Sequence, residues 1–171
     1  FESKKSLIRF EPLGIIFGIM PWNFPFWQVF RFAIPSLIAG NTVLLKHAPN
    51  VTGTALALEQ LIQQVYPSQY AALIVSNEDL ATLIQDPRVA AVSLTGSPWA
   101  GRAVAIAAAQ GLKKTVLELG GSDAFIVAED ADIAAAATAA LQSRFSNSGQ
   151  VCIAAKRFIV LEPVMEAFLA A

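Results

Sequence analysis

One stretch of the chain limits its possible folds more than any other: between Pro12 and Leu45 the only charged residue is Arg31. An apolar run of this length is typical either of a membrane-spanning helix or of a buried parallel strand followed by a buried helix. Pro21 and Pro25 stand near the centre of its uncharged part and would interrupt the hydrogen bonds of a spanning helix. We therefore favour the buried strand and helix over a membrane span.

Along the rest of the chain, short apolar runs alternate with helix-like segments. This alternation predicts βαβ units and therefore an α/β fold with a doubly wound, mostly parallel sheet. We expect strands at residues 14–20, 42–46, 71–75, 89–94, 115–119, 125–127 and 157–161. We expect helices at residues 25–39, 50–66, 78–85, 98–110, 132–145 and from 163 onward, with Asn50 as the N-cap of the second. The pattern restarts after Gly120-Gly121, which is the best candidate for a domain boundary.

The composition excludes several classes of function. Hydrophobic residues make up 55% of the 171 residues and charged residues 15%, which is too apolar for an intrinsically disordered chain. The net charge of −1 gives no basic surface that would attract nucleic acid. A single cysteine and a single histidine exclude an internal disulfide and a Cys/His metal site. Since we find no signal-peptide pattern and no disulfide, we expect a cytoplasmic protein.

The candidate site residues are polar residues at the carboxyl ends of the predicted strands, because ligands of a parallel sheet bind outside these ends. They are Asn23, Lys46, the Thr95-Gly96-Ser97 turn and Glu118. The turn could hold an anion at a helix N-terminus or be an ordinary helix cap, and the local sequence leaves both open. Glu118 could likewise be a general base or a structural carboxylate in an ion pair.

Cys152 lies in the loop-like segment Ser148-Gly149-Gln150-Val151-Cys152. A lone cysteine is more often a small buried hydrophobic residue than a nucleophile. A catalytic thiol would need a base or a dipole beside it to raise its thiolate fraction. The residues alone leave both interpretations open.

A set of motifs resembles the aldehyde dehydrogenase superfamily, whose members oxidise aldehydes to acids with NAD or NADP. The motifs are Ile19-Met20-Pro21-Trp22-Asn23-Phe24-Pro25, Leu45-Lys46, Thr95-Gly96-Ser97, Leu117-Glu118-Leu119-Gly120-Gly121 and Gly149-Gln150-Val151-Cys152. Their order and spacing match the family over essentially the whole chain. Residues 44–50 and 149–158 look most like succinate-semialdehyde dehydrogenases.

This resemblance implies the catalytic roles. Cys152 would be the nucleophile that forms a thiohemiacetal and then a thioester, and the Asn23 amide and the Cys152 backbone N–H would stabilise the oxyanion. Glu118 would be the general base that activates water to hydrolyse the thioester. Arg31 matches an arginine that binds the distal carboxylate of the substrate, although a structural ion pair would explain it equally well. A second such arginine of some members is Ser146 here, so other small aldehydes stay open.

For the cofactor, the resemblance implies that Lys46 contacts the adenosine ribose and Ser97 the pyrophosphate. Further residues would line the cofactor cleft: Ile19, Pro21, Trp22, Gly96 and Leu119. NAD-preferring relatives often have an acidic residue where this chain has Pro49. We therefore expect room for a 2′-phosphate, assisted by His47, and either NAD or NADP as the cofactor.

The resemblance also divides the chain. Residues 1–10 resemble the end of the oligomerisation strand, residues 11–120 the later part of the NAD(P)-binding domain, and residues 121–171 the start of the catalytic domain. Full family members are much longer, so we expect an incomplete Rossmann-like fold and a homo-oligomer in the full-length enzyme. Two functions stay open. One is oxidation of a small aldehyde, with succinate semialdehyde first, and the other is a truncated, non-catalytic nucleotide-binding remnant.

Overall fold

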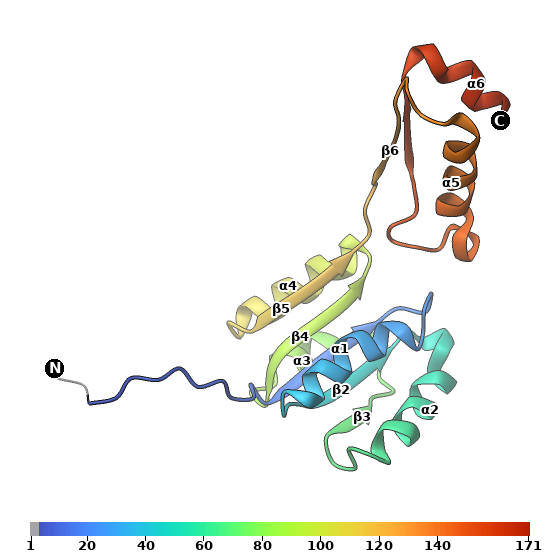
Figure 1. The fold of residues 1–171 in the computed structure, drawn as a ribbon. Coiled ribbons are helices and arrows are strands. Elements are labelled where there is room, and N and C mark those ends of the chain that lie inside the picture. Colours follow the sequence, from blue (N-terminus) through green and yellow to red (C-terminus); the bar gives the residue numbers. More distant parts are fainter. Residues whose placement is uncertain (1–3) are drawn as a thin grey trace. The chain divides into compact units, whose positions relative to one another are not determined.

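The structure, a computed structural model, describes residues 4–171. The chain divides into two compact units, Phe1–Glu118 and Leu119–Ala171. In Figure 1 the first unit runs from blue to yellow and the second from orange to red. The division falls beside the Gly120-Gly121 boundary expected from the sequence, while the identities of the two domains stay predictions.

A sheet forms the centre of the first unit. Its strands are β1 (Ile15–Met20), β2 (Thr42–His47), β3 (Tyr70–Ala72), β4 (Val89–Gly96) and β5 (Lys114–Leu119). The spatial order is β3-β2-β1-β4-β5, and β1 pairs in parallel with both β2 and β4 (Figure 1). The strand β3 pairs in parallel with β2 at the edge. Because the strand order changes direction between β1 and β4, this is a doubly wound sheet, and the expected fold class is confirmed.

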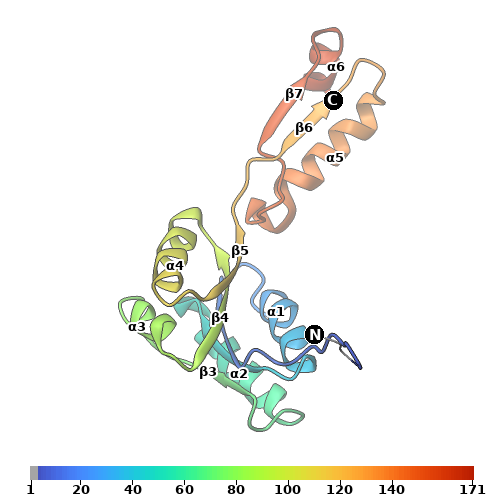
Figure 2. The ribbon, with the colours of Figure 1, turned by 90° about the vertical axis from the view of Figure 1, so that its left-hand side faces the viewer.

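Helices cover both faces of this sheet. They are α1 (Trp27–Ile38), α2 (Thr52–Gln63), α3 (Leu80–Gln85) and α4 (Pro98–Gln110). Apolar side chains of α1 and α2 form one buried cluster with β1, β2 and β3, and those of α3 and α4 form another with β1 and β4. Figure 2 shows α3 and α4 on one side of β4 and α1 on the other. In the nearly uncharged run at residues 12–45, β1 is thus buried on both faces. The helix α1 packs one side on the sheet, while Trp27 and Ile38 are exposed.

No helix within residues 4–171 is both long enough and apolar enough to cross a membrane.

Two local expectations differ from the structure. The helix α2 begins at Thr52, and its N-cap is Val51 rather than Asn50, because Pro49 starts a short 3₁₀ turn over Pro49–Val51 that precedes the helix. The strand β3 is shorter than expected and ends at Ala72. The N–H of Leu73 donates the last hydrogen bond to β2, and the chain then leaves the sheet.

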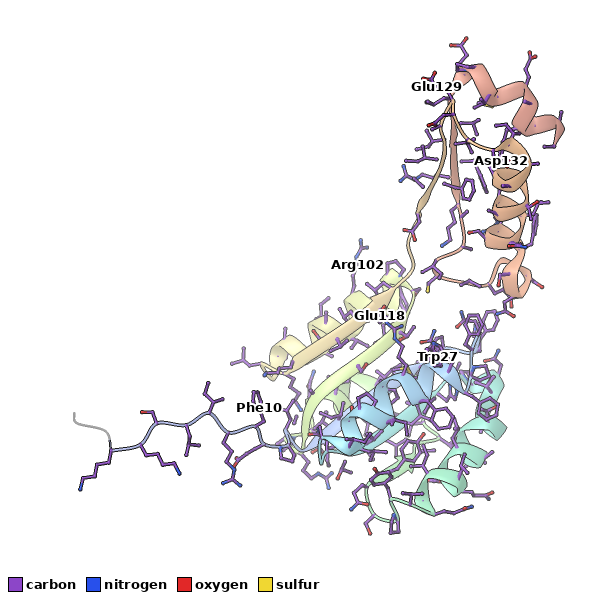
Figure 3. All side chains as sticks on the ribbon, in the orientation of Figure 1. Phe10, Trp27, Arg102, Glu118, Glu129 and Asp132 are labelled. Carbon is purple, nitrogen blue, oxygen red and sulfur yellow. The ribbon has the colours of Figure 1, made fainter. Side chains whose placement is uncertain are left out.

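The second unit is a small α/β arrangement. Its strands β6 (Ala124–Val127) and β7 (Arg157–Val160) pair in parallel, and α5 (Ile133–Phe145) connects them. A side-chain oxygen of Asp132 accepts a hydrogen bond from the N–H of Ala135 at 3.1 Å and so caps α5 (Figure 3). A 3₁₀ turn at Glu162–Val164 leads into α6 (Met165–Ala170).

Residues 5–13 form neither helix nor strand, and the side chains of Leu7, Ile8 and Phe10 are exposed (Figure 3). The expected oligomerisation strand at residues 1–10 therefore stays a prediction, and residues 1–3 lie outside the described part of the chain.

Candidate active site

A cavity of about 340 Å³ lies at the carboxyl ends of β1, β2 and β4, where the strand order changes direction. We call it the switch-point cavity. Ile19, Pro21, Lys46 and Gly96 line it, and side chains of α3 and α4 close its sides. Trp22, Ser97 and Leu119 are not among the lining residues. Parallel sheets bind their ligands at such a crevice, so the structure brings the larger part of the predicted cofactor set to the expected place.

Lys46 is the charged residue of this cavity, and only 6% of its surface is exposed. Its Nζ donates a hydrogen bond to Oδ1 of Asn77 at 2.7 Å. Within residues 4–171, no carboxylate forms an ion pair with Lys46. Burial lowers the pKa of the Lys46 ammonium below its ordinary value. A buried cation whose partner is a neutral amide is an incomplete ion pair, and a bound anion would complete it.

The sequence reasoning missed Asn77. This residue lies in the connection between β3 and α3, 31 positions after Lys46, and it also lines the switch-point cavity. A signal was available, because Asn77 is a polar residue shortly after a predicted strand, as Asn23 is. Its pairing with Lys46, however, is a tertiary contact that no local pattern contains.

Ser97 caps α4. Its Oγ accepts a hydrogen bond from the N–H of Ala100 at 3.2 Å, and Pro98 occupies the first helical turn. The hydroxyl proton of Ser97 is not used by this contact and can still be donated to an anion. The helix cap is thus confirmed, and an anion at this helix N-terminus stays a prediction that the cap does not exclude.

His47 contacts backbone groups of the protein, which is not the cofactor contact that the sequence suggested. The side chain is buried, and its Nδ1 lies 3.0 Å from the backbone nitrogen of Ala48 and 3.1 Å from the carbonyl oxygen of Met20. Its Nε2 lies 2.9 Å from the carbonyl oxygen of Pro25, so each ring nitrogen faces a backbone carbonyl oxygen. The ring thus ties the end of β2 to the turn before α1. This corrects the expectation that His47 assists a 2′-phosphate, because both ring nitrogens are engaged by backbone groups of the protein.

Arg31 and Glu118, which are 87 positions apart in the sequence, contact each other. Nη2 of Arg31 on α1 donates to Oε1 of Glu118 on β5 at 2.8 Å, and about half of each side chain is exposed (Figure 3 labels Glu118). Both line a second cavity of about 440 Å³ together with Gln28, whose Oε1 is buried and has no hydrogen-bond partner within residues 4–171. An exposed ion pair contributes about 0–1 kcal/mol, so either partner can exchange it for a ligand at little cost. The ion pair that the sequence left open for both residues thus exists.

Asn23 follows β1 in the bend that leads to α1, and it is half-buried. The contact between Nε2 of His47 and the carbonyl oxygen of Pro25 ties this bend to the end of β2. This places the side-chain amide at the carboxyl end of β1, where the sequence predicted it.

Cys152 is exposed, which the alternative of a buried hydrophobic cysteine does not predict. It lies in a turn closed by the N–H of Ala154, which donates to the carbonyl oxygen of Val151 at 3.2 Å. Nζ of Lys156 donates to the carbonyl oxygen of Cys152 at 2.7 Å. The backbone around Cys152 is therefore held by hydrogen bonds while its thiol faces outward.

Three consecutive residues with positive φ precede this turn: Asn147 at 48°, Ser148 at 57° and Gly149 at 75°. A Cβ atom at Gly149 would lie 2.9 Å from Nη2 and 3.1 Å from the carbonyl oxygen of Arg144. Glycine is therefore required here both for the left-handed backbone and for the close approach of Arg144. Left-handed non-glycine residues store backbone strain and cluster at functional sites.

The predicted catalytic residues are distributed over both units: Asn23 and Glu118 belong to the first, and Cys152 belongs to the second. Within residues 4–171, no group of three or more His, Cys, Asp or Glu side chains could hold a metal ion.

Comparisons with known proteins agree with the motifs. The chain is 52% identical over 169 residues to a probable succinate-semialdehyde dehydrogenase (NADP(+)) of Synechocystis sp., and this alignment covers 98% of the chain and 37% of the relative. It is 50% identical, with the same coverage, to a succinate semialdehyde dehydrogenase (NAD(P)+) of Escherichia coli. The crystal structure of succinic semialdehyde dehydrogenase from Streptococcus pyogenes in complex with NADP+ has a TM-score of 0.88 and 40% identity, covering 92% of this chain and 35% of that one.

The chain thus spans about 37% of the length of the curated relatives it matches. The sequence model of the aldehyde dehydrogenase family matches residues 2–171. From its motifs, its fold and these matches, the chain belongs to the aldehyde dehydrogenase family.

Proposed function

We propose that this chain carries the thiol nucleophile, the general base and the adenosine end of the cofactor site of an NAD(P)-dependent aldehyde dehydrogenase, and that succinate semialdehyde is its substrate. The observation that carries the proposal is the exposed thiol of Cys152 on a turn held by backbone hydrogen bonds. An accessible thiol on a backbone held in place suits covalent catalysis, and the family supplies the reaction class.

In the proposed mechanism the Cys152 thiolate attacks the carbonyl carbon of the aldehyde and forms a thiohemiacetal. The side-chain amide of Asn23 and the backbone N–H of Cys152 donate hydrogen bonds to the resulting oxyanion. Bound NAD(P)+ supplies the acceptor for the hydride. Glu118 then takes a proton from a water molecule, and the resulting hydroxide attacks the acyl carbon on Cys152, which releases the carboxylic acid and the thiolate.

The residues of the switch-point cavity fit the adenosine end of such a cofactor. The buried Lys46 lacks a carboxylate partner within residues 4–171, and its ammonium can donate to a ribose hydroxyl or to a phosphate. At the position three places after this lysine, Pro49 carries no negative charge that would repel a 2′-phosphate. We therefore propose that NADP is accepted, as the names of the relatives from Synechocystis sp. and Escherichia coli state for those proteins.

The choice of succinate semialdehyde rests on Arg31 and on the names of the relatives. The guanidinium of Arg31 uses one N–H donor for Glu118 and keeps others that can bind a second carboxylate. The distal carboxylate of succinate semialdehyde would either bind Arg31 together with Glu118 or displace Glu118 from Arg31. Because the pair is half exposed, displacement costs little compared with a new charge-assisted contact.

The test is aldehyde-dependent formation of NAD(P)H by the full-length protein, compared with its Cys152→Ser variant. We expect the wild type to oxidise succinate semialdehyde, and we expect the variant to lose roughly 10⁴-fold or more in kcat, as enzymes do when their nucleophile is removed. A circular dichroism spectrum equal to that of the wild type controls for folding. A wild type that binds the cofactor without oxidising any aldehyde would instead support the non-catalytic alternative, and full activity of Cys152→Ser would contradict the assignment of the nucleophile.

A further inference from the structure

The contact between Lys46 and Asn77 fixes the orientation of the Asn77 amide. An ammonium group can only donate hydrogen bonds, so the atom that faces Nζ at 2.7 Å is the carbonyl oxygen Oδ1. The Nδ2 group of Asn77 therefore points away from Lys46 with two N–H donors. Within residues 4–171, no hydrogen bond from Nδ2 to another protein group is found.

A smaller recess of about 130 Å³ adjoins this contact, and we call it the lysine recess. Its lining includes Lys46, Pro49, Thr52, Ser76 and Asn77. Lys46, Pro49 and Asn77 also line the switch-point cavity, so these residues stand at the border of both spaces. A group attached to an adenosine ribose in the larger cavity would meet Lys46 and Asn77 first.

The other polar side chains of the lysine recess have already used their protons. The hydroxyl of Thr52 donates to the carbonyl oxygen of Pro49 at 2.9 Å, and the hydroxyl of Ser76 donates to Oδ2 of Asp79 at 2.8 Å. The side-chain donors that remain for a ligand are therefore the ammonium of Lys46 and Nδ2 of Asn77.

The charged side chain that lines the lysine recess is the ammonium of Lys46, which favours an anion. Glu78 and Asp79 follow Asn77 in the sequence, but neither lines the lysine recess or the switch-point cavity. The space bordered by Lys46 thus contains a cation and amide donors without a carboxylate. A phosphate monoester accepts hydrogen bonds and carries negative charge at neutral pH, so its chemistry matches this donor set.

We propose that Asn77 is a specificity-determining residue that selects the 2′-phosphate of NADP. Its Oδ1 positions the ammonium of Lys46, and its Nδ2 donates to the phosphate. This inference rests on the proposed function, since it deepens the cofactor choice of the same site. It goes further in one respect, because it assigns the preference to a residue outside the motifs that resemble the family.

The Asn77→Asp variant tests this proposal with almost no change of shape. The new carboxylate keeps the contact to Lys46 but replaces the Nδ2 donors with an acceptor, so it neutralises the ammonium and repels the 2′-phosphate. A ribose 2′-hydroxyl, by contrast, can donate to a carboxylate. We therefore expect the Kd of NADP+ to rise by about 10- to 150-fold, the range for a lost charge-assisted hydrogen bond. The Kd of NAD+ is expected to stay the same or fall.

The measurement is isothermal titration calorimetry of the full-length protein with NADP+ and with NAD+, which needs no aldehyde and no turnover. Gln69→Glu is the matched control, because it also converts an exposed amide into a carboxylate. Gln69 lies just before β3, at the amino end of the strand, whereas Asn77 follows the carboxyl end. It should leave both affinities unchanged. Asn77→Ala should weaken the binding of NADP+ more than the binding of NAD+, because Lys46 loses the contact that positions its ammonium.

An unchanged ratio of the two Kd values in Asn77→Asp would overturn the proposal, and so would an equal loss for both cofactors. Its failure differs from that of the proposed function. A protein that prefers NADP+ through Asn77 but oxidises no aldehyde leaves this inference standing and removes the enzyme assignment. A protein that oxidises aldehydes but has the same cofactor preference in the wild type and in Asn77→Asp supports the proposed function and overturns this inference.

Discussion

The two units of the chain differ in how their structure is maintained. In the first unit, large apolar side chains such as Phe17, Leu45 and Leu58 are completely buried between the sheet and its helices. In the second unit, the buried side chains are Val127 and a few alanines, while Leu141 and Phe145 of α5 are exposed. The first unit therefore has a core of its own, whereas the second has little.

The functional groups follow the same division. The lysine of the proposed cofactor site lies on β2 of a packed sheet, and its hydrogen bond holds the amide of Asn77 in the connection after β3. The backbone that carries the thiol of Cys152 is held by turn hydrogen bonds and follows a glycine that its conformation requires. The position of the lysine in the proposed cofactor site therefore depends on packing, while the position of the proposed nucleophile depends on local backbone structure.

The largest effect on stability should come from the core of the first unit. We expect Leu58→Ala to lower the free energy of unfolding of this unit by about 2–5 kcal/mol, because the side chain is fully buried and its removal leaves a cavity. Leu61→Ala on the same helix α2 is the control, and since Leu61 is 52% exposed it should cost about 0.5 kcal/mol or less. Urea unfolding of the full-length variants measures both values. Equal losses would show that α2 is not packed as described.

A smaller effect, confined to substrate choice, should come from Arg31→Ala. We expect kcat/KM for succinate semialdehyde to fall by about 10- to 150-fold relative to butyraldehyde, because only the former has a carboxylate that can pair with Arg31. The ion pair with Glu118 gives this experiment a second use. If Arg31 acted only by holding Glu118, kcat/KM would change equally for both aldehydes.

Arg102→Ala removes the same charge from the exposed surface of α4 and serves as the control for Arg31→Ala (Figure 3). It should leave the ratio of the two kcat/KM values unchanged. If the ratio of the two kcat/KM values is also unchanged in Arg31→Ala, then Arg31 does not bind the substrate carboxylate and only forms the ion pair with Glu118.

Much of the fold was predictable from the sequence, because buried parallel strands and amphipathic helices leave clear patterns. The extents of β1 and α4 agree closely with the expectations, since Gly14 and Ser97 mark their beginnings. The N-cap at Asn50 was wrong because Pro49 began a separate turn one residue earlier. The end of β3 was wrong because the edge strand stops where its pairing with β2 stops, and pairing is not a local property.

The candidate site was predictable to the extent that single strand ends define it. Lys46 and Gly96 follow this rule, and both line the predicted cavity. The contacts of Lys46 with Asn77 and of Arg31 with Glu118 were not predictable, because each joins residues far apart in the sequence. The correction for His47 has the same cause, since its role is set by a carbonyl oxygen 22 positions away.

The central claim is that cofactor binding in the first unit and thiol chemistry in the second belong to one reaction. It is tested most directly by the rate at which iodoacetamide alkylates Cys152 in the full-length protein, followed by mass spectrometry of the peptide that contains this residue, with increasing NADP+. We predict that the rate changes by about threefold or more, because a bound cofactor alters the environment that sets thiolate fraction and access. The change in alkylation rate should reach half of its maximum at an NADP+ concentration equal to the Kd measured by calorimetry. A rate that stays constant while calorimetry shows saturation with NADP+ would contradict the claim.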